Sequence, residues 1–298
     1  MRFATLGLVA AVLASPAFAA DLDYGVLRGS DDDYAAPAPI IDWSGFYVGG
    51  HGGYSSAALG FGNAFQPIVA NALRYSVAEG EFNASQLLAA RSTHATGGSY
   101  GAFAGINYQF DEVVVGLEAD YTFFGKRGST FDQISRFGLA KDGYLTTVAL
   151  KGQASTEIED FGSVRGRAGY AFGNFLPYVT AGLAIGRAVV SNTVDIQSYG
   201  YDQAAFNANQ ANGTQNFVNR YGYTTFNPNN PIRSTPATET YGATKKVTIG
   251  GVALGAGLEY AITPNILLRG EYQFVLFNDF QGHKAELNTV RGGAAIKF

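Results

Sequence analysis

The chain has 298 residues, with 20 basic residues against 24 acidic ones and a formal net charge of −4. An acidic chain gives no support to nucleic-acid binding. The absence of cysteine excludes a disulfide framework, a thiolate metal site and a cysteine nucleophile. Aromatic residues make up 14% of the chain and charged residues only 15%, with 39 glycines. This composition favours closely packed β-strands over a helical enzyme.

The first 19 residues have the pattern of a secretory signal peptide. Arg2 precedes a short apolar run from Leu6 to Leu13, and Ala17-Phe18-Ala19 fits the small-x-small cleavage rule. The apolar run is too short to span a membrane as a helix. Residues 20–42 contain proline, alanine and three consecutive aspartates but no apolar period, and we predict that they form a flexible periplasmic leader.

Residues 43–298 contain eight segments with β-strand patterning. These segments are 43–54, 98–110, 113–124, one ending at 172, one starting at 176, 247–262, 266–277 and 285–298. Tight turns are predicted at 111–112, 173–175 and 263–265. The other connections are predicted as long polar loops at 56–97, 126–155 and 192–245 and a short one at 278–284. Alternation of tight turns with longer loops is typical of a transmembrane β-barrel.

Charged and apolar side chains occupy opposite faces of these strands. In the third strand, Glu118 and Asp120 share one face, while Leu117 and Tyr121 lie on the other. The apolar faces also carry tyrosines near several strand ends, as in the aromatic girdles of membrane proteins. We therefore predict an all-β fold, an eight-stranded antiparallel up-and-down transmembrane β-barrel with long extracellular loops, formed by residues 43–298.

The face that points into the predicted barrel collects four acids and five bases. They are Glu118, Asp120, Glu259 and Glu271, and Arg165, Arg167, Arg269, Arg291 and Lys297. Eight strands leave an interior just wide enough for side chains to fill. Because an unpaired buried ion is strongly destabilising, we predict that these nine residues form a lumen ionic network that plugs the barrel. No catalytic constellation and no metal site is predicted.

The last strand places Val290, Ile296 and Phe298 on its apolar face. A strand with this alternation that ends on an aromatic residue is expected to be the closing strand of the barrel. We predict that Phe298 is the assembly signal and that the barrel-assembly machinery is a partner during insertion.

Several strand motifs resemble those of one known family. Gly45–Gly49 reads GFYVG, Gly116–Asp120 reads GLEAD, and Phe161–Tyr170 reads FGSVRGRAGY, with Asp160 where the family usually has Trp. Further matching blocks are Leu176–Gly182, Gly257–Tyr260, Thr263–Asn265 and Thr289–Gly292. In this order they resemble the alphaproteobacterial outer-membrane β-barrel proteins, the porin-like or opacity-type major surface proteins. The resemblance covers most of the strands and none of the loops.

The resemblance implies an abundant protein of the Gram-negative outer membrane, with no catalytic residues. We favour a structural barrel that displays surface loops and has a plugged lumen. One alternative is a narrow porin for small hydrophilic solutes, and the other is a surface ligand binder or adhesin for haem or a host partner. Expected partners are outer-membrane lipid and lipopolysaccharide, and a possible surface ligand through loops 56–97 and 192–245. No cofactor, nucleic acid or enzymatic activity is expected.

Two rival sites rest on histidine or tyrosine. His283 with a serine such as Ser191 would be the pair needed for a lipid-modifying enzyme, which requires the nucleophile within hydrogen-bond reach of its base. Haem binding would use candidate ligands in the predicted loops, because both histidine and tyrosine ligate haem iron. These candidates are His94, Tyr199, Tyr201, Tyr221 and Tyr223.

Overall fold

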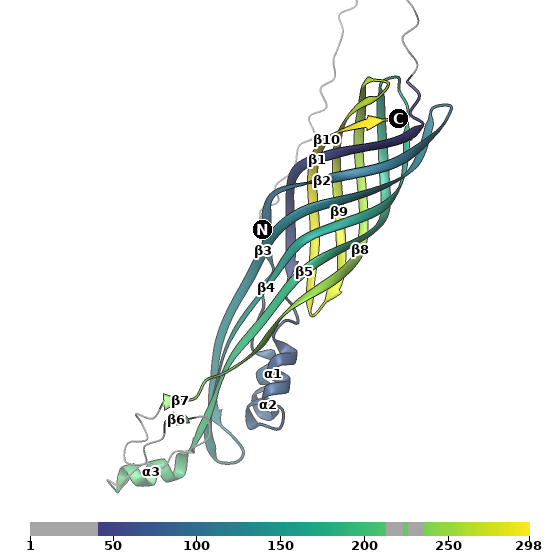
Figure 1. The fold of residues 1–298 in the computed structure, drawn as a ribbon. Helices are drawn as coiled ribbons and strands as arrows, with labels where there is room; N and C mark the ends of the chain where they lie inside the picture. Colours follow the sequence, from purple (N-terminus) through teal and green to yellow (C-terminus); the bar gives the residue numbers. More distant parts are fainter. Residues whose placement is uncertain (1–40, 213–222, 226–234) are drawn as a thin grey trace, which may run out of the picture. The chain divides into compact units, whose positions relative to one another are not determined.

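The computed structural model describes residues 41–212, 223–225 and 235–298; the predicted signal peptide and most of the predicted leader lie outside them. Within this part of the chain, eight antiparallel strands close into a barrel in the order β1-β10-β9-β8-β5-β4-β3-β2 (Figure 1). The strands are β1 (Gly45–Gly60), β2 (Thr93–Phe110), β3 (Val113–Leu139), β4 (Tyr144–Tyr170), β5 (Phe175–Asp202), β8 (Glu239–Thr263), β9 (Ile266–Phe280) and β10 (His283–Lys297). This ring confirms the predicted architecture.

Short elements lie in two of the connections. Between β1 and β2 are α1 (Gln66–Ala72), α2 (Val77–Phe82) and the 3₁₀-helix η1 (Ala84–Gln86); between β5 and β8 are α3 (Gln203–Ala211), β6 (Tyr223–Thr225) and β7 (Thr235–Pro236). The Ser76 hydroxyl caps α2 by accepting a hydrogen bond from the Glu79 backbone amide, and α2 ends at Asn83 in the left-handed conformation. No helix among the described residues is long and apolar enough to cross a membrane.

The predicted alternation of faces is present in the barrel. In β3, Glu118 and Asp120 are 1% and 6% exposed, whereas Leu117 and Tyr121 are 61% and 40% exposed. The outward-facing aromatic rings gather in two bands. One band lies at the end of the barrel with the tight turns, and the other lies eight residues further along β2, from Tyr108 to Tyr100, or about 27 Å of strand. Because the strands of such barrels are tilted by about 35–45°, this length corresponds to an apolar belt about 20 Å high, close to the apolar band of about 25 Å typical of outer-membrane barrels.

The predicted loop 126–155 is wrong, because these residues are mostly strand. β3 and β4 stay paired from Lys126↔Ile158 to Leu139↔Leu145, and they are joined only by a turn at 140–143. β5 and β8 extend in the same way, so β3, β4, β5 and β8 continue as a four-stranded sheet past the end of the other strands (Figure 1). We call this part, residues 126–158, 188–202 and 239–250, the extension sheet. Its outward face is mostly polar, with Phe131, Phe137 and Leu139 as exposed apolar residues on β3. The continuous apolar alternation of a membrane strand therefore stops, while the hydrogen-bonded ladder continues.

The other predicted long loops are also shorter than expected. In 56–97, β1 continues to Gly60 and β2 begins at Thr93, and α1, α2 and η1 occupy much of the remainder. In 192–245, β5 runs to Asp202 and β8 begins at Glu239. The connection predicted at 278–284 is reduced to Gln281 and Gly282, which both have positive φ angles of 55° and 79°, as a two-residue hairpin requires.

We predict slow amide exchange in the part of β4 that the sequence suggested was a loop. Residues 146–158 lie between β3 and β5, so both edges of this strand are hydrogen-bonded. Hydrogen–deuterium exchange of the folded protein should show these amides exchanging far more slowly than those of an unstructured segment. Rapid exchange throughout 146–158 would contradict the extension sheet.

Candidate functional site

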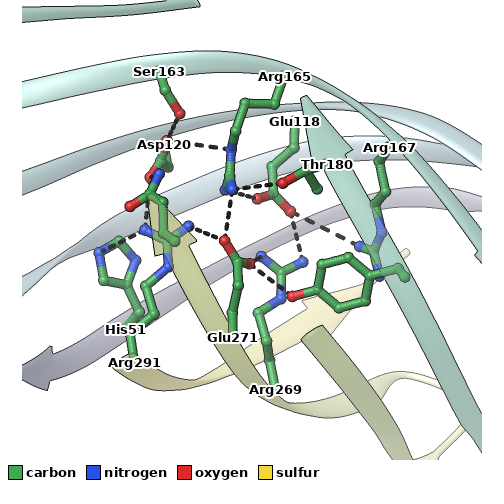
Figure 2. A network of polar contacts seen from close by, with 12 residues as sticks. His51, Glu118, Asp120, Ser163, Arg165, Arg167, Thr180, Arg269, Glu271 and Arg291 are labelled. Atoms are coloured by element: carbon green, nitrogen blue, oxygen red, sulfur yellow. Dashed lines mark hydrogen bonds and ion pairs between the residues drawn. The ribbon is translucent and has the colours of Figure 1, made fainter. Parts of the chain in front are cut away.

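Eight of the nine predicted lumen residues lie in one layer inside the barrel. β3 contributes Glu118 and Asp120, and both the neighbouring strand β4 and strands across the lumen contribute their partners (Figure 2). The other members are Arg165 and Arg167 from β4, Glu259 from β8, Arg269 and Glu271 from β9, and Arg291 from β10. Their side chains are at most 2% exposed. We call these eight residues the ionic layer.

The first half of the layer is centred on Arg165, which spans the lumen. Its Nη2 lies 2.7 Å from Glu118 Oε1, and its Nη1 lies 2.6 Å from Glu271 Oε1. Arg291 also bridges two acids, with Nη2 2.8 Å from Glu271 Oε1 and Nη1 2.7 Å from Asp120 Oδ2. The two arginines therefore share Glu271 and connect β4 to β3, β9 and β10.

The second half of the layer continues from Glu118. Arg269 Nη2 lies 2.6 Å from both Glu118 Oε2 and Glu259 Oε1. Arg167 Nη2 completes the series at 2.5 Å from Glu259 Oε2. The charges thus alternate along one chain of contacts, Asp120–Arg291–Glu271–Arg165–Glu118–Arg269–Glu259–Arg167, and the four negative charges balance the four positive ones.

Hydroxyl groups and aromatic rings complete the environment of these charges. Tyr47 donates a hydrogen bond of 2.8 Å to Glu118, Tyr178 donates one of 2.7 Å to Glu271, and Ser163 donates one to Asp120. The guanidinium of Arg167 lies 4.0 Å from the centre of the Tyr178 ring. Hydrogen bonds to buried carboxylates reduce the cost of removing them from water. These neutral partners could not be assigned from strand alternation alone.

Lys297 was predicted to belong to the ionic network, and this prediction is wrong. Its ammonium group donates a hydrogen bond to the backbone carbonyl of Asp42, and it forms no ion pair with another described residue. Lys297 ends β10 at the mouth of the barrel, six residues from Arg291. The sequence correctly predicted that Lys297 points into the barrel. Its position along the barrel axis, at the end of β10, keeps it away from the four acids of the ionic layer.

Two apolar clusters flank the ionic layer, and the sequence analysis missed both. Along the inward face of β9, Leu267 precedes Arg269 and Glu271, and Val275 and Phe277 follow them. Leu267 belongs to the turn-side cluster, which contains Ile41, Trp43, Tyr47, Phe103, Val114, Leu176, Ala261, Leu267 and Ala295. Ile41, at the end of the predicted leader, is thus part of the folded barrel.

The second cluster closes the opposite end of the lumen, and we call it the plug cluster. It joins inward-facing strand residues such as Val275 and Phe277 to Phe61, Phe65 and Val69 from the connection between β1 and β2. Phe61, Phe65 and Val69 are at most 2% exposed. This connection therefore folds into the barrel end instead of forming only a surface loop.

The structure does not bring His283 and Ser191 together. His283 Nδ1 lies 2.6 Å from Thr156 Oγ1, and its Nε2 lies 2.9 Å from Asn192 Oδ1. Ser191 Oγ lies 2.8 Å from Thr244 Oγ1. Because Ser191 and Asn192 are adjacent in β5, their side chains point to opposite faces, so a Ser191–His283 pair has no geometric support.

Of the candidate haem ligands, His94 is exposed in β2, and Tyr199 lies in β5 on the extension sheet. Tyr221 lies outside the described residues, as do the side chains of Tyr201 and Tyr223. Haem binding by this set therefore stays a prediction.

We predict that Arg165→Ala lowers the free energy of unfolding by about 3–5 kcal/mol, because it leaves Glu118 and Glu271 buried without their shared partner. The control is Lys246→Ala, which removes a lysine that is 78% exposed and paired with Glu159, itself 32% exposed, and which should cost much less. Urea unfolding in detergent micelles can be followed by the fluorescence of Trp43, the only tryptophan. Equal losses for the two variants would contradict the assigned ion pairs.

Comparison with known proteins agrees with this architecture. The outer membrane protein beta-barrel domain family matches residues 6–298. A 31 kDa outer-membrane immunogenic protein of Brucella melitensis is 29% identical, and a 22 kDa outer membrane protein of Rhizobium leguminosarum is 31% identical, each over the whole of both chains. The crystal structure of Neisserial surface protein A aligns with 86% of this chain and 98% of that one, at 14% identity and a TM-score of 0.35. The chain belongs to the outer membrane protein beta-barrel family and is a protein of the Gram-negative outer membrane.

Proposed function

We propose that this protein is a closed structural barrel that anchors the extension sheet at the cell surface. The observation that carries the proposal is the alternating chain of eight charges across the lumen, enclosed between two apolar clusters. Short turns of outer-membrane barrels lie in the periplasm and longer connections lie outside. This orientation places the extension sheet outside the cell.

The side chains of the ionic layer are packed against one another and closed to solvent. Side chains that line a water-filled channel are solvated, whereas those of Arg165, Glu118 and Glu271 are completely buried. Moving any one of them aside would leave an unpaired charge in an interior that excludes water, which is strongly unfavourable. A lumen built from only eight strands offers little space for such a movement. These points support a plug over the narrow porin.

The apolar clusters support the same conclusion independently of the charges. Trp43 is fully buried in the turn-side cluster, and its indole nitrogen donates a hydrogen bond of 3.4 Å to the Gly173 carbonyl. At the end of the lumen away from the tight turns, Phe61 and Phe65 pack against the inward-facing strand residues of the plug cluster. A hydrated ion would have to displace apolar side chains at both ends as well as the ionic layer, and such packing is worth several kcal/mol.

The proposal predicts only rare and small openings of the full chain in planar lipid bilayers. Replacing residues 62–92 with a short glycine-serine linker removes the α1 part of the plug cluster but leaves the ionic layer, so conductance should stay low. Adding Glu118→Ala and Arg165→Ala, which together keep the lumen neutral, and Trp43→Ala, which opens the turn-side cluster, should raise it clearly. Steady conductance of the unmodified protein, comparable to that of a wide porin, would contradict the plug and support the porin.

A further inference from the structure

The outward face of the extension sheet carries a groove, and two exposed aromatic rings flank its residues Gln133 and Ser135 along β3. Phe131 and Phe137 lie on β3 and are 53% and 76% exposed, although they are well beyond the outer aromatic band. Large apolar side chains gathered on a water-exposed face commonly mark a binding surface. The groove has a volume of about 470 Å³, within the range of ligand sites, and the Phe131 ring lies beside it, with its centre 5.9 Å from the ammonium group of the lining residue Lys151.

The pairing of the strands explains the shape of this groove. Ser135 and Ala149 face each other across β3 and β4, and these small side chains form its floor. The next row is Gln133 on β3, Lys151 on β4 and Asp195 on β5, which are aligned in register. These three polar side chains form one row of the groove, and Gln197 on β5 lies in the neighbouring row, in register with Ala149 and Ser135.

Several polar groups in the groove are available to a ligand. Within the described part of the chain, the side chains of Gln133 and Ser135 make no hydrogen bond with the protein. Gln197 uses its amide nitrogen to contact the Pro236 carbonyl at 3.1 Å and Thr238, which leaves its side-chain oxygen as an acceptor. An amide that offers both donors and acceptors suits adjacent hydroxyl groups.

The charge of the groove indicates the kind of ligand. Lys151 and Asp195 are its two charged residues, and their charges cancel. Neutral hydrogen-bonding groups next to flat aromatic surfaces match the hydroxyls and the apolar ring faces of a sugar chain. A strongly acidic ligand would require an excess of basic side chains.

We propose that this groove binds the neutral sugar chain of lipopolysaccharide in the same membrane. Gln133 lies on the same outward face of β3 as Phe123 of the outer aromatic band, ten residues or about 33 Å further along the strand and beyond the bulge between Phe123 and Lys126. The groove therefore opens sideways, toward the polysaccharide that surrounds an outer-membrane barrel. The site is independent of whether the lumen conducts, and it shares with the proposed function only the placement of the extension sheet outside the cell.

The test uses the full chain refolded in nanodiscs and the polysaccharide released by mild acid from lipopolysaccharide of the source strain. Dextran of similar size and lipid A alone are the comparison probes. We expect saturable binding of the released polysaccharide by calorimetry, and about a tenfold rise in the dissociation constant for Gln133→Ala combined with Gln197→Ala. The control is Gln66→Ala, an exposed glutamine of α1, which should bind like the unmodified protein.

Ser135→Trp provides a second variant, because it fills the groove floor and leaves the neighbouring amides in place. It should also abolish binding, while exchange protection of residues 146–158 shows that the sheet is intact. Three results would overturn the proposal: no binding by the unmodified protein, equal binding of dextran or lipid A, or undiminished binding by both groove variants. Binding of a protein ligand that the same variants abolish, without binding of the polysaccharide, would assign the groove to a different partner.

Discussion

The structure depends on the need to satisfy every backbone hydrogen bond in a medium without water. A β-sheet can cross hydrocarbon only when its ring closes, because an open edge would leave polar groups unpaired. Eight strands close this ring, with β1 paired to both β2 and β10. Closure then divides each strand into an apolar lipid-facing set and an inward set, and it makes the interior so narrow that inward charges have to neutralise one another.

The ionic layer neutralises the inward charges, and the alternation of acids and arginines along it explains its stability. An isolated buried ion pair often contributes little, because desolvation offsets the attraction. Here most members contact two opposite charges, and hydroxyl donors such as Tyr47 and Tyr178 occupy further carboxylate oxygens. Removing one charge therefore affects several strands at once. The apolar clusters on either side exclude water, which strengthens the ion pairs and raises the cost of leaving any of them unpaired.

Alternation along the strands was enough to predict the barrel, the strand number and the inward position of all nine charged residues. It could not predict the ion pairs that cross the lumen, such as Arg165–Glu271 and Arg291–Asp120, since these depend on the stagger between strands that are distant in sequence. Other pairs, such as Glu259–Arg269, join residues that face each other on neighbouring strands. The same limit placed Lys297 in the network, although it contacts Asp42 at the barrel mouth. The extension sheet was missed because its outward face is mostly polar, and because bulges at Phe123/Lys126 and Ile158/Asp160 interrupt the pairing where it begins. The plug cluster was missed because Phe65 and Val69 lie at the start of and within the short helix α1, which has no barrel pattern.

The central claim is that the lumen is closed to water-soluble molecules, and thiol accessibility tests it most directly. The chain contains no cysteine, so single substitutions give an unambiguous signal. Ser55 is fully buried in the lumen between Ser99 and Thr289, whereas Ser129 is exposed on the outward face of β3. In the folded protein, a charged thiol reagent should modify Ser129→Cys quickly and leave Ser55→Cys unreacted until the barrel is unfolded. Modification of both at similar rates in the folded state would contradict a sealed lumen.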